Sequence, residues 1–288
     1  MTETLTLRAA ALRCELVPAL GGSLAGLWLD DREILRHSPA QQMQSGLDGA
    51  SYPLVPYSNR IGHRALHWAG QHHVLAPNFP QEPHSIHGVG WMRPWQVEQA
   101  DGNQARLRCQ HGGDANWPFA FDSEQRFVLK PDALEMHMRI TNRAGIAVPA
   151  GLGWHPYFAK TAATRIRFGS ARRWEMAADM LPTQPLPHAG LDTDCSSLVV
   201  DHCFDGWAGA LQLIDGDLKV EVSSDLTRLV VYTTPVRDSI AVEPVSHVNN
   251  ALALADGGVA TLQELGMQVL QPGQTLAASM RIRVEKTA

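Results

Sequence analysis

The 288-residue sequence has few basic residues and no long hydrophobic run. It contains 24 Lys and Arg against 29 Asp and Glu, which gives a formal net charge of −5, and the basic residues do not cluster. A protein that binds a phosphate backbone usually presents a concentrated basic surface, so we expect no nucleic-acid partner. Because no segment approaches the ~18 apolar residues that a membrane-spanning helix needs, we also expect no membrane partner.

Cysteine is scarce, and its spacing does not indicate a metal site or a disulfide framework. The four cysteines form no Cys-x-x-Cys pair and no zinc-finger pattern, and they are Cys14, Cys109, Cys195 and Cys203. We expect them to be free, buried side chains in a reducing compartment. The apolar stretch near the N-terminus contains Arg8 and Arg13, so it does not resemble a signal peptide. These features predict a cytoplasmic location.

Helical periodicity is also scarce, and its best case is a weak pattern over residues 261–268 that would end before Pro272. Strand patterns dominate instead. Short alternating or β-branched segments bounded by turn residues occur at residues 11–17, 23–29, 105–110, 125–129, 134–141, 218–223, 228–233 and 280–284. The turn from Lys130 to Ala133 would join two of them as an antiparallel hairpin, because Pro131 is pre-set for a turn.

Nothing in the sequence marks a domain boundary. The 24 glycines and 18 prolines are spread along the chain rather than gathered into a linker. Hydrophobic residues make up 44% of the chain and charged residues 18%, which suits a globular protein with a sizeable core. The sequence therefore predicts one all-β domain over residues 1–288, built as a large antiparallel β-sandwich.

Four short segments, far apart in the chain, carry groups that could do chemistry. They are Asn59-Arg60, His87-Gly88, the run Trp-His-Pro-Tyr-Phe at 154–158, and Glu243-Pro244 followed by Asn249. Together they supply two imidazoles, one carboxylate and one guanidinium. This set suits acid–base chemistry on a small polyhydroxylated molecule.

Glu243 and His155 are the candidate proton carriers. Glu243 ends an apolar strand pattern, where partial desolvation would raise the pKa of its carboxyl. His155 lies between glycines and aromatic residues, and an imidazole with a pKa near 6.5 can hold and deliver a proton at neutral pH. A glutamate at a strand end is commonly a surface residue, and a histidine among aromatic residues is commonly a core residue. The residues alone leave both interpretations open.

The same motifs, with Asn250-Ala251 after Glu243-Pro244, resemble those of the aldose 1-epimerases, also called galactose mutarotases, over roughly residues 20–285. The resemblance implies a supersandwich fold with the sugar in a groove on a concave sheet face. It implies an isomerase that opens a cyclic sugar and recloses it on the other face, without a cofactor or metal. Glu243 would be the base and His155 the acid, on opposite sides of the acetal. His87 would assist at the ring oxygen.

The resemblance also assigns residues that bind sugar hydroxyls. Arg60 matches the arginine of the family's Asn-Arg-Ile element, with Asn59 beside it, and its forked donors suit neighbouring hydroxyls. Asp201 resembles a hydroxyl-binding aspartate over a short match, and a turn aspartate is the alternative. Trp154, and with it Trp91 or Trp95, could stack on a sugar face or fill the core.

Three alternatives remain open from the sequence. The region of Arg93, with Arg64, somewhat resembles hexose-6-phosphate epimerases of the same fold. The histidines between residues 63 and 87 could serve a metal-dependent enzyme, although no ligand motif is present. A sugar-binding module without turnover would also keep an arginine and aromatic residues. The epimerase and binding-module alternatives, like the aldose 1-epimerase interpretation, predict a small-molecule sugar as the partner. We expect the protein to be a monomer or a homodimer.

Overall fold

Strands account for almost all of the regular structure in the computed structural model, which describes residues 3–287. The larger sheet has 12 strands, and its main path is antiparallel throughout. In spatial order this path is β1 (Leu5–Ala9), β2 (Leu12–Val17), β3 (Ser23–Leu29), β4 (Arg32–Leu35), β16 (Tyr157–Ala159), β25 (Ser239–Val245), β24 (Arg228–Thr233), β21 (Val200–Asp205), β18 (Arg172–Met176) and β19 (Pro182–Pro187). Beside it, β15 (Gly153–Trp154) pairs with both β25 and β5 (Pro53–Leu54).

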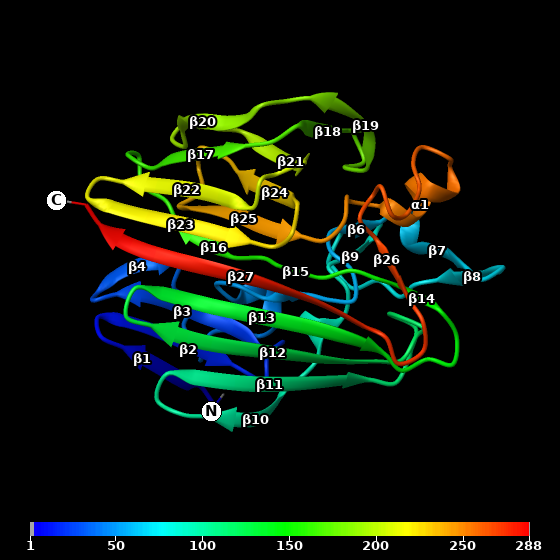
Figure 1. Cartoon of the computed structure of the whole chain (residues 1–288), viewed down its shortest axis with the longest axis horizontal. Helices are drawn as coiled ribbons and strands as arrows, with labels where there is room; N and C mark the ends of the chain where they lie inside the picture. Colours follow the sequence, from blue (N-terminus) through cyan, green and yellow to red (C-terminus); the bar gives the residue numbers. More distant parts are fainter. Residues whose placement is uncertain (1–2, 288) are drawn as a thin grey trace.

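The second sheet has nine strands and lies across the view in Figure 1, with β27 in red between β13 and β23. Its order is β10 (Gln96–Ala100), β11 (Gln104–His111), β12 (Phe121–Lys130), β13 (Ala133–Asn142), β27 (Thr275–Lys286), β23 (Leu218–Ser224), β22 (Ala210–Asp215), β17 (Arg165–Gly169) and β20 (Gly190–Asp194). The fold class predicted from the sequence, an all-β protein with large antiparallel sheets, is confirmed.

The smaller elements connect these sheets. Three two-stranded pairs are β6 (Arg60–Ile61) with β9 (Ser85–Ile86), β7 (Ala65–Trp68) with β8 (Gln71–Val74), and β14 (Val148–Ala150) with β26 (Gln268–Leu270). The described helices are α1 (Ala251–Asp256) and the 3₁₀ turns η1 (Gly46–Asp48), η2 (Gly62–Arg64) and η3 (Gly90–Met92). No helix among residues 3–287 is long and apolar enough to cross a membrane.

Many of the strands form where the sequence alternates, whereas β3 and β25 are buried along their whole length. In β11, Ala105, Leu107 and Cys109 are buried while their neighbours are more exposed, because successive strand residues point to opposite faces. Lys130 pairs with Ala133, which confirms the predicted hairpin between β12 and β13. Buried side chains from both sheets form one continuous hydrophobic cluster. All four cysteines are free and buried, as expected.

The predicted helix over residues 261–268 is wrong. Thr261 and Glu264 do form the reciprocal side-chain contacts of a helix start, and the amide of Leu265 donates to the carbonyl of Thr261 at 3.0 Å. The turn then stops at Gly266, whose φ is +81°, a conformation that side-chain-bearing residues rarely adopt. The following residues leave as strand β26.

Candidate active site

Six of the seven residues predicted to form a site line one cavity of about 330 Å³. They are Asn59, Arg60, His87, His155, Asp201 and Glu243. Further residues, not predicted from the sequence, complete the wall, among them Tyr52, Phe79, Glu82, Tyr157, Tyr232 and Arg237. The cavity has the size and the mixture of aromatic and polar walls that suit a small polar ligand.

One face of the larger sheet provides the floor of this cavity. Strands β16, β25, β24 and β21 are consecutive neighbours, and Tyr157, Ala241, Tyr232 and Asp201 are directly paired across them. Directly paired residues share a face, and Glu243 shares the face of Ala241 because it lies two residues further along β25. The register therefore brings Glu243, Asp201 and two tyrosine side chains to the same side of the sheet.

Two loops add His87 and Asn59 from the side. Both residues have left-handed backbones, with φ of 62° and 52°. The His87 amide donates to the Asn59 carbonyl at 2.8 Å, and the Asn59 amide donates to Nδ1 of His87 at 3.2 Å. Because Nδ1 accepts a hydrogen bond, the ring proton sits on Nε2. Burial lowers the pKa of His87 to about 3, so the imidazole is a neutral N–H donor.

The His87 loop is held from behind by Asn78 and by a close backbone approach at Gly88. The Asn78 amide group donates to the carbonyls of Ile86 and Gly88 and accepts from the amide of Ile86. Gly88 has φ of +67°, and a Cβ atom there would lie 2.2 Å from the carbonyl oxygen of Val55. Only glycine fits this position without moving the loop.

Glu243 and His155 are in direct contact: Oε1 of the carboxyl lies 3.1 Å from Nε2 of the imidazole. Both side chains are buried, with 2% and 6% of their surface exposed. Burial raises the pKa of Glu243 well above its usual value, with a smaller rise from the charge of Asp201, and burial lowers the pKa of His155. The pair can therefore carry a single proton at neutral pH. The two groups lie side by side on the cavity wall.

Each member of the pair has one further polar atom with no partner. Oε2 of Glu243 and Nδ1 of His155 are buried and make no hydrogen bond to any described residue of the chain. Buried polar atoms in proteins nearly always find a partner, so these two are candidates for contact with a bound molecule or water.

Aromatic side chains surround the imidazole of His155. Its ring stacks on Tyr52 with 4.7 Å between centroids and lies 4.5 Å from the ring of Tyr157. The guanidinium of Arg36 lies 3.6 Å from the centroid of Tyr157 on one ring face. The backbone amides of His155 and Tyr157 donate to the carbonyls of Tyr52 and Ala50, which fixes the orientation of this segment.

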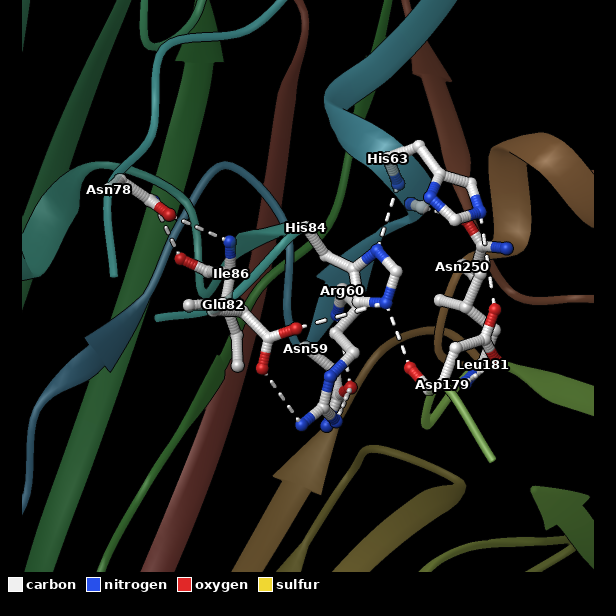
Figure 2. Close-up of polar contacts among 11 residues, drawn as sticks. Asn59, Arg60, His63, Asn78, Glu82, His84, Ile86, Asp179, Leu181 and Asn250 are labelled. Atoms are coloured by element: carbon white, nitrogen blue, oxygen red, sulfur yellow. Dashed lines mark hydrogen bonds and ion pairs between the residues drawn. The ribbon is translucent and has the colours of Figure 1, made fainter. Parts of the chain in front are cut away.

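Arg60 is bound by two neighbours inside the cavity. Its guanidinium donates to Glu82 Oε2 and to Asn59 Oδ1, each at 3.3 Å (Figure 2). Asp201 is close enough for the charges of both Arg60 and Glu82 to act on its pKa, which burial raises overall. Arg60 and Asp201 were predicted from the sequence, whereas Glu82 was not, because it follows the Phe79-Pro80 turn and lies in no motif.

The segment after Glu243 supports the Asn59–Arg60 loop. The amide of Ser58 donates to Nε2 of His247 at 3.0 Å, and the amide of Gly62 donates to the side chain of Asn250 at 2.9 Å. Nδ1 of His247 lies 2.8 Å from the carbonyl of Val248, so Nδ1 carries the proton. These residues brace the loop and do not line the cavity. His247 was not predicted from the sequence, because one of its partners, Ser58, is distant in the sequence and the other is the backbone carbonyl of its neighbour Val248.

Trp154 is a correction to the predicted site. Its side chain is fully buried in the hydrophobic core and does not line the cavity. Trp154 and His155 are consecutive residues, and extended backbone sends consecutive side chains to opposite faces. Since His155 points into the cavity, Trp154 points into the core. Trp91 and Trp95 are also core residues outside the cavity wall.

Apart from His87, the features behind two alternatives lie outside the cavity. Arg93 forms an ion pair with Asp114, and neither Arg93 nor Arg64 lines the cavity. Among residues 3–287, no group of three His, Cys, Asp or Glu side chains is arranged to hold a metal ion. Within the histidine-rich region, His84 is fully buried and hydrogen-bonded, and His67 and His72 lie on the exposed β7–β8 hairpin.

Comparison with solved structures identifies the same fold. A protein from Escherichia coli K12 that carries a provisional aldose 1-epimerase name has a TM-score of 0.89, 22% identity, and coverage of 99% of both chains. A galactose mutarotase-like protein from Clostridium acetobutylicum has a TM-score of 0.85 and 16% identity, covering 99% of this chain and 95% of its own.

Sequence comparison identifies the family. An uncharacterized protein of Escherichia coli (strain K12), YphB, is 25% identical over 289 residues, covering 92% of this chain and 93% of its own. The family model described as aldose 1-epimerase matches residues 3–283, which is nearly the whole chain. The chain therefore belongs to the aldose 1-epimerase family.

Proposed function

From its membership in the aldose 1-epimerase family, we propose that this protein is a cofactor-independent isomerase that interconverts the α and β anomers of a free aldose. The observation that carries the proposal is the buried Glu243–His155 pair, with 3.1 Å between Oε1 and Nε2, on the wall of a sugar-sized cavity. A pair that takes one proton from a ligand and gives another to it is the minimum that ring opening requires.

Ring opening needs two proton transfers, one at each of the two oxygens bonded to the anomeric carbon C1. Burial favours the shared proton on Glu243, so this proton first moves across the 3.1 Å contact to His155. Glu243, as carboxylate, then takes the proton of the anomeric hydroxyl while protonated His155 gives a proton to the ring oxygen. The bond between C1 and the ring oxygen breaks, and C1 becomes a carbonyl. After rotation about the C1–C2 bond, the ring hydroxyl attacks the other face, His155 recovers its proton and Glu243 returns the other.

The contact between the two groups suits this chemistry because both sugar oxygens are attached to C1 and are close together. A base and an acid that serve them must also be neighbours. Their direct hydrogen-bonding distance also lets the proton move between Glu243 and His155 when no sugar is bound. The pair then titrates as one unit, so its two apparent pKa values belong to the pair.

His87 has a different role in this proposal. Its neutral Nε2–H can donate a hydrogen bond to the ring oxygen, and its ring lies 5.1 Å from that of His155 between centroids. Because the pKa of His87 is about 3, it orients and polarises the ring oxygen without supplying a proton. Arg60, Asn59 and Asp201 are proposed to bind hydroxyls further along the sugar.

We favour a free aldose over a hexose phosphate because Arg93 and Arg64, the arginines behind that alternative, do not line the cavity. We favour catalysis over binding alone because Glu243, His155 and His87 all line it together.

The test is NMR magnetisation exchange between anomers of galactose, glucose, arabinose, xylose, rhamnose and fucose, with and without the protein. Acceleration for at least one sugar, lost in Glu243→Gln and retained in Glu124→Gln, is expected. Glu124 is a matched control because it forms a surface ion pair with Arg139 away from the cavity. Unchanged exchange in Glu243→Gln would remove Glu243 from its role, and no acceleration of any sugar would overturn the proposed reaction.

A further inference from the structure

We propose that Glu82 determines substrate specificity: with Arg60 it binds neighbouring hydroxyls of the sugar, and its negative charge excludes sugars that carry a phosphate or carboxylate group. The inference rests on the proposed anomer interconversion at this cavity. It concerns a residue that lies outside the four motifs and that the proposed acid–base steps do not use.

The first support is the position of the Glu82 carboxylate. It lines the cavity, its side chain is 16% exposed, and Oε2 lies 3.3 Å from Nη2 of Arg60, whose side chain is 11% exposed. The two groups present an acceptor and a donor side by side. A pair of adjacent sugar hydroxyls offers the complementary arrangement, because each hydroxyl both donates and accepts. The positive charge of the Arg60 donor is therefore already balanced by the carboxylate of Glu82.

The second support is that the segment carrying Glu82 is fixed in place. Nδ1 of the fully buried His84 accepts from the amide of His63 at 2.9 Å, so its proton is on Nε2. Nε2 donates to the carbonyl of Asp179 at 2.8 Å and lies 3.8 Å from Oε1 of Glu82 (Figure 2). His84 thus ties the Glu82 segment to η2 and to the turn between β18 and β19. A carboxylate on a segment anchored in this way is part of a pre-formed wall.

The third support is the balance of charge around the cavity. The Glu243–His155 pair carries a single proton and is neutral overall, which leaves the carboxyl groups of Glu82 and Asp201 against the guanidinium groups of Arg60 and Arg237. Arg60 is already paired with Glu82, and Arg237 lies over the ring of Tyr232. The charge of Glu82 acts on Asp201, and the charge of Asp201 acts on Glu243. An anionic group bound beside Glu82 would therefore meet a like charge and an arginine that is already paired, which disfavours its binding.

The test compares neutral and anionic sugars of matched ring configuration. Anomer exchange is measured for a hexose, its 6-phosphate and the corresponding hexuronate, with wild type, Glu82→Gln and the surface control Glu124→Gln. Wild type is expected to prefer the neutral sugar. In Glu82→Gln, KM for the neutral sugar should rise about three- to tenfold with kcat within about twofold, since this residue binds substrate without moving a proton. The preference for neutral over anionic sugar should fall at least about tenfold, the change expected when one like charge is removed.

The outcomes separate this inference from the proposed function. If wild type accelerates exchange but Glu82→Gln keeps the wild-type preference, Glu82 only positions Arg60 and the inference is wrong. If wild type prefers the anionic sugar, Arg237 has the larger influence and the inference is again wrong. If wild type accelerates no sugar, the proposed function fails, and the same selectivity is measured as binding by NMR titration. Should Glu82→Gln not fold, added salt provides the second measurement: screening should raise the relative rate or affinity for anionic sugars in wild type, and no change would overturn the inference.

Discussion

Oε1 of Glu243 and Nε2 of His155 lie 3.1 Å apart in a buried site, so the proposed base and the proposed acid form one hydrogen-bonded unit. Replacing either with a neutral amide, as in Glu243→Gln or His155→Gln, should slow anomer exchange by about 10²–10⁴-fold, the usual contribution of general acid–base catalysis. Because each group needs the other, the double variant should be little slower than the slower single variant. Exchange NMR on all three variants measures this, and additive losses would contradict a shared unit.

The neutral state of His87 gives a different expectation. His87→Ala removes the Nε2–H donor and should lower kcat about 10²–10³-fold, the range for loss of a donor to a developing charge. His87→Gln keeps an N–H donor and should lose less. Because the pKa of His87 is about 3, neither variant should move the limbs of the pH–rate profile between pH 5 and 8.5. A limb that shifts in His87→Gln would show that His87 titrates during catalysis or that its charge acts on the pKa of His155.

Local patterns predicted strands such as β11, β12 and β13 because burial alternates within them. The sequence of β12 and β13 carries the period of two and the Pro131 turn, so their pairing could be read without tertiary information. The helix prediction failed where a local start signal at Thr261 competed with a left-handed Gly266 five residues later. That glycine also lies against the carbonyl of Ser246, a distant contact that no local pattern reports.

The site was only partly predictable for the same reason. Glu243, His155, His87 and Arg60 lie in motifs whose residue types indicate chemistry. Tyr232 and Glu82 reach the cavity through sheet register and loop anchoring, which depend on pairings between distant segments. Trp154 was misassigned because an aromatic residue inside a motif does not reveal which face of the strand it occupies.

Gly88 should tolerate alanine less well than Gly70, although both have left-handed backbones, with φ of +67° and +75°. Gly70→Ala meets no atom within 4 Å and should cost only the backbone strain, about 1–2 kcal/mol of unfolding free energy. Gly88→Ala must in addition displace the carbonyl of Val55, so its cost should exceed that of Gly70→Ala by about 2 kcal/mol or more. Urea denaturation measures both. Exchange should slow in Gly88→Ala alone, because His87 adjoins it, and equal losses of stability would reject the steric argument.

Burial of neutral histidine predicts a loss of stability in acid. Burial lowers the pKa of His247 from 6.5 to about 4, so between these values the unfolded chain binds more protons than the folded chain. The unfolding free energy that His247 contributes is therefore complete above pH 6.5 and falls by about 3 kcal/mol as the pH drops to 4. Glu243 acts with the opposite sign, since its raised pKa favours folding at low pH. The pH dependence of the total unfolding free energy therefore combines the opposite contributions of His247 and Glu243.

Comparison of wild type with His247→Gln isolates the share of His247. Glutamine can accept from the amide of Ser58 but does not gain a proton in this range, so the variant should lose less stability on acidification. At pH 7.5 it should be less stable than wild type by about 1–3 kcal/mol, because one buried hydrogen bond is imperfectly replaced. The control is His137→Gln, a change at an exposed residue of β13, which should follow the wild-type curve. Urea denaturation at pH 4.5, 5.5, 6.5 and 7.5 measures these curves, and a wild-type slope in His247→Gln would mean that another buried group, such as His87 with its pKa of about 3, accounts for the acid sensitivity.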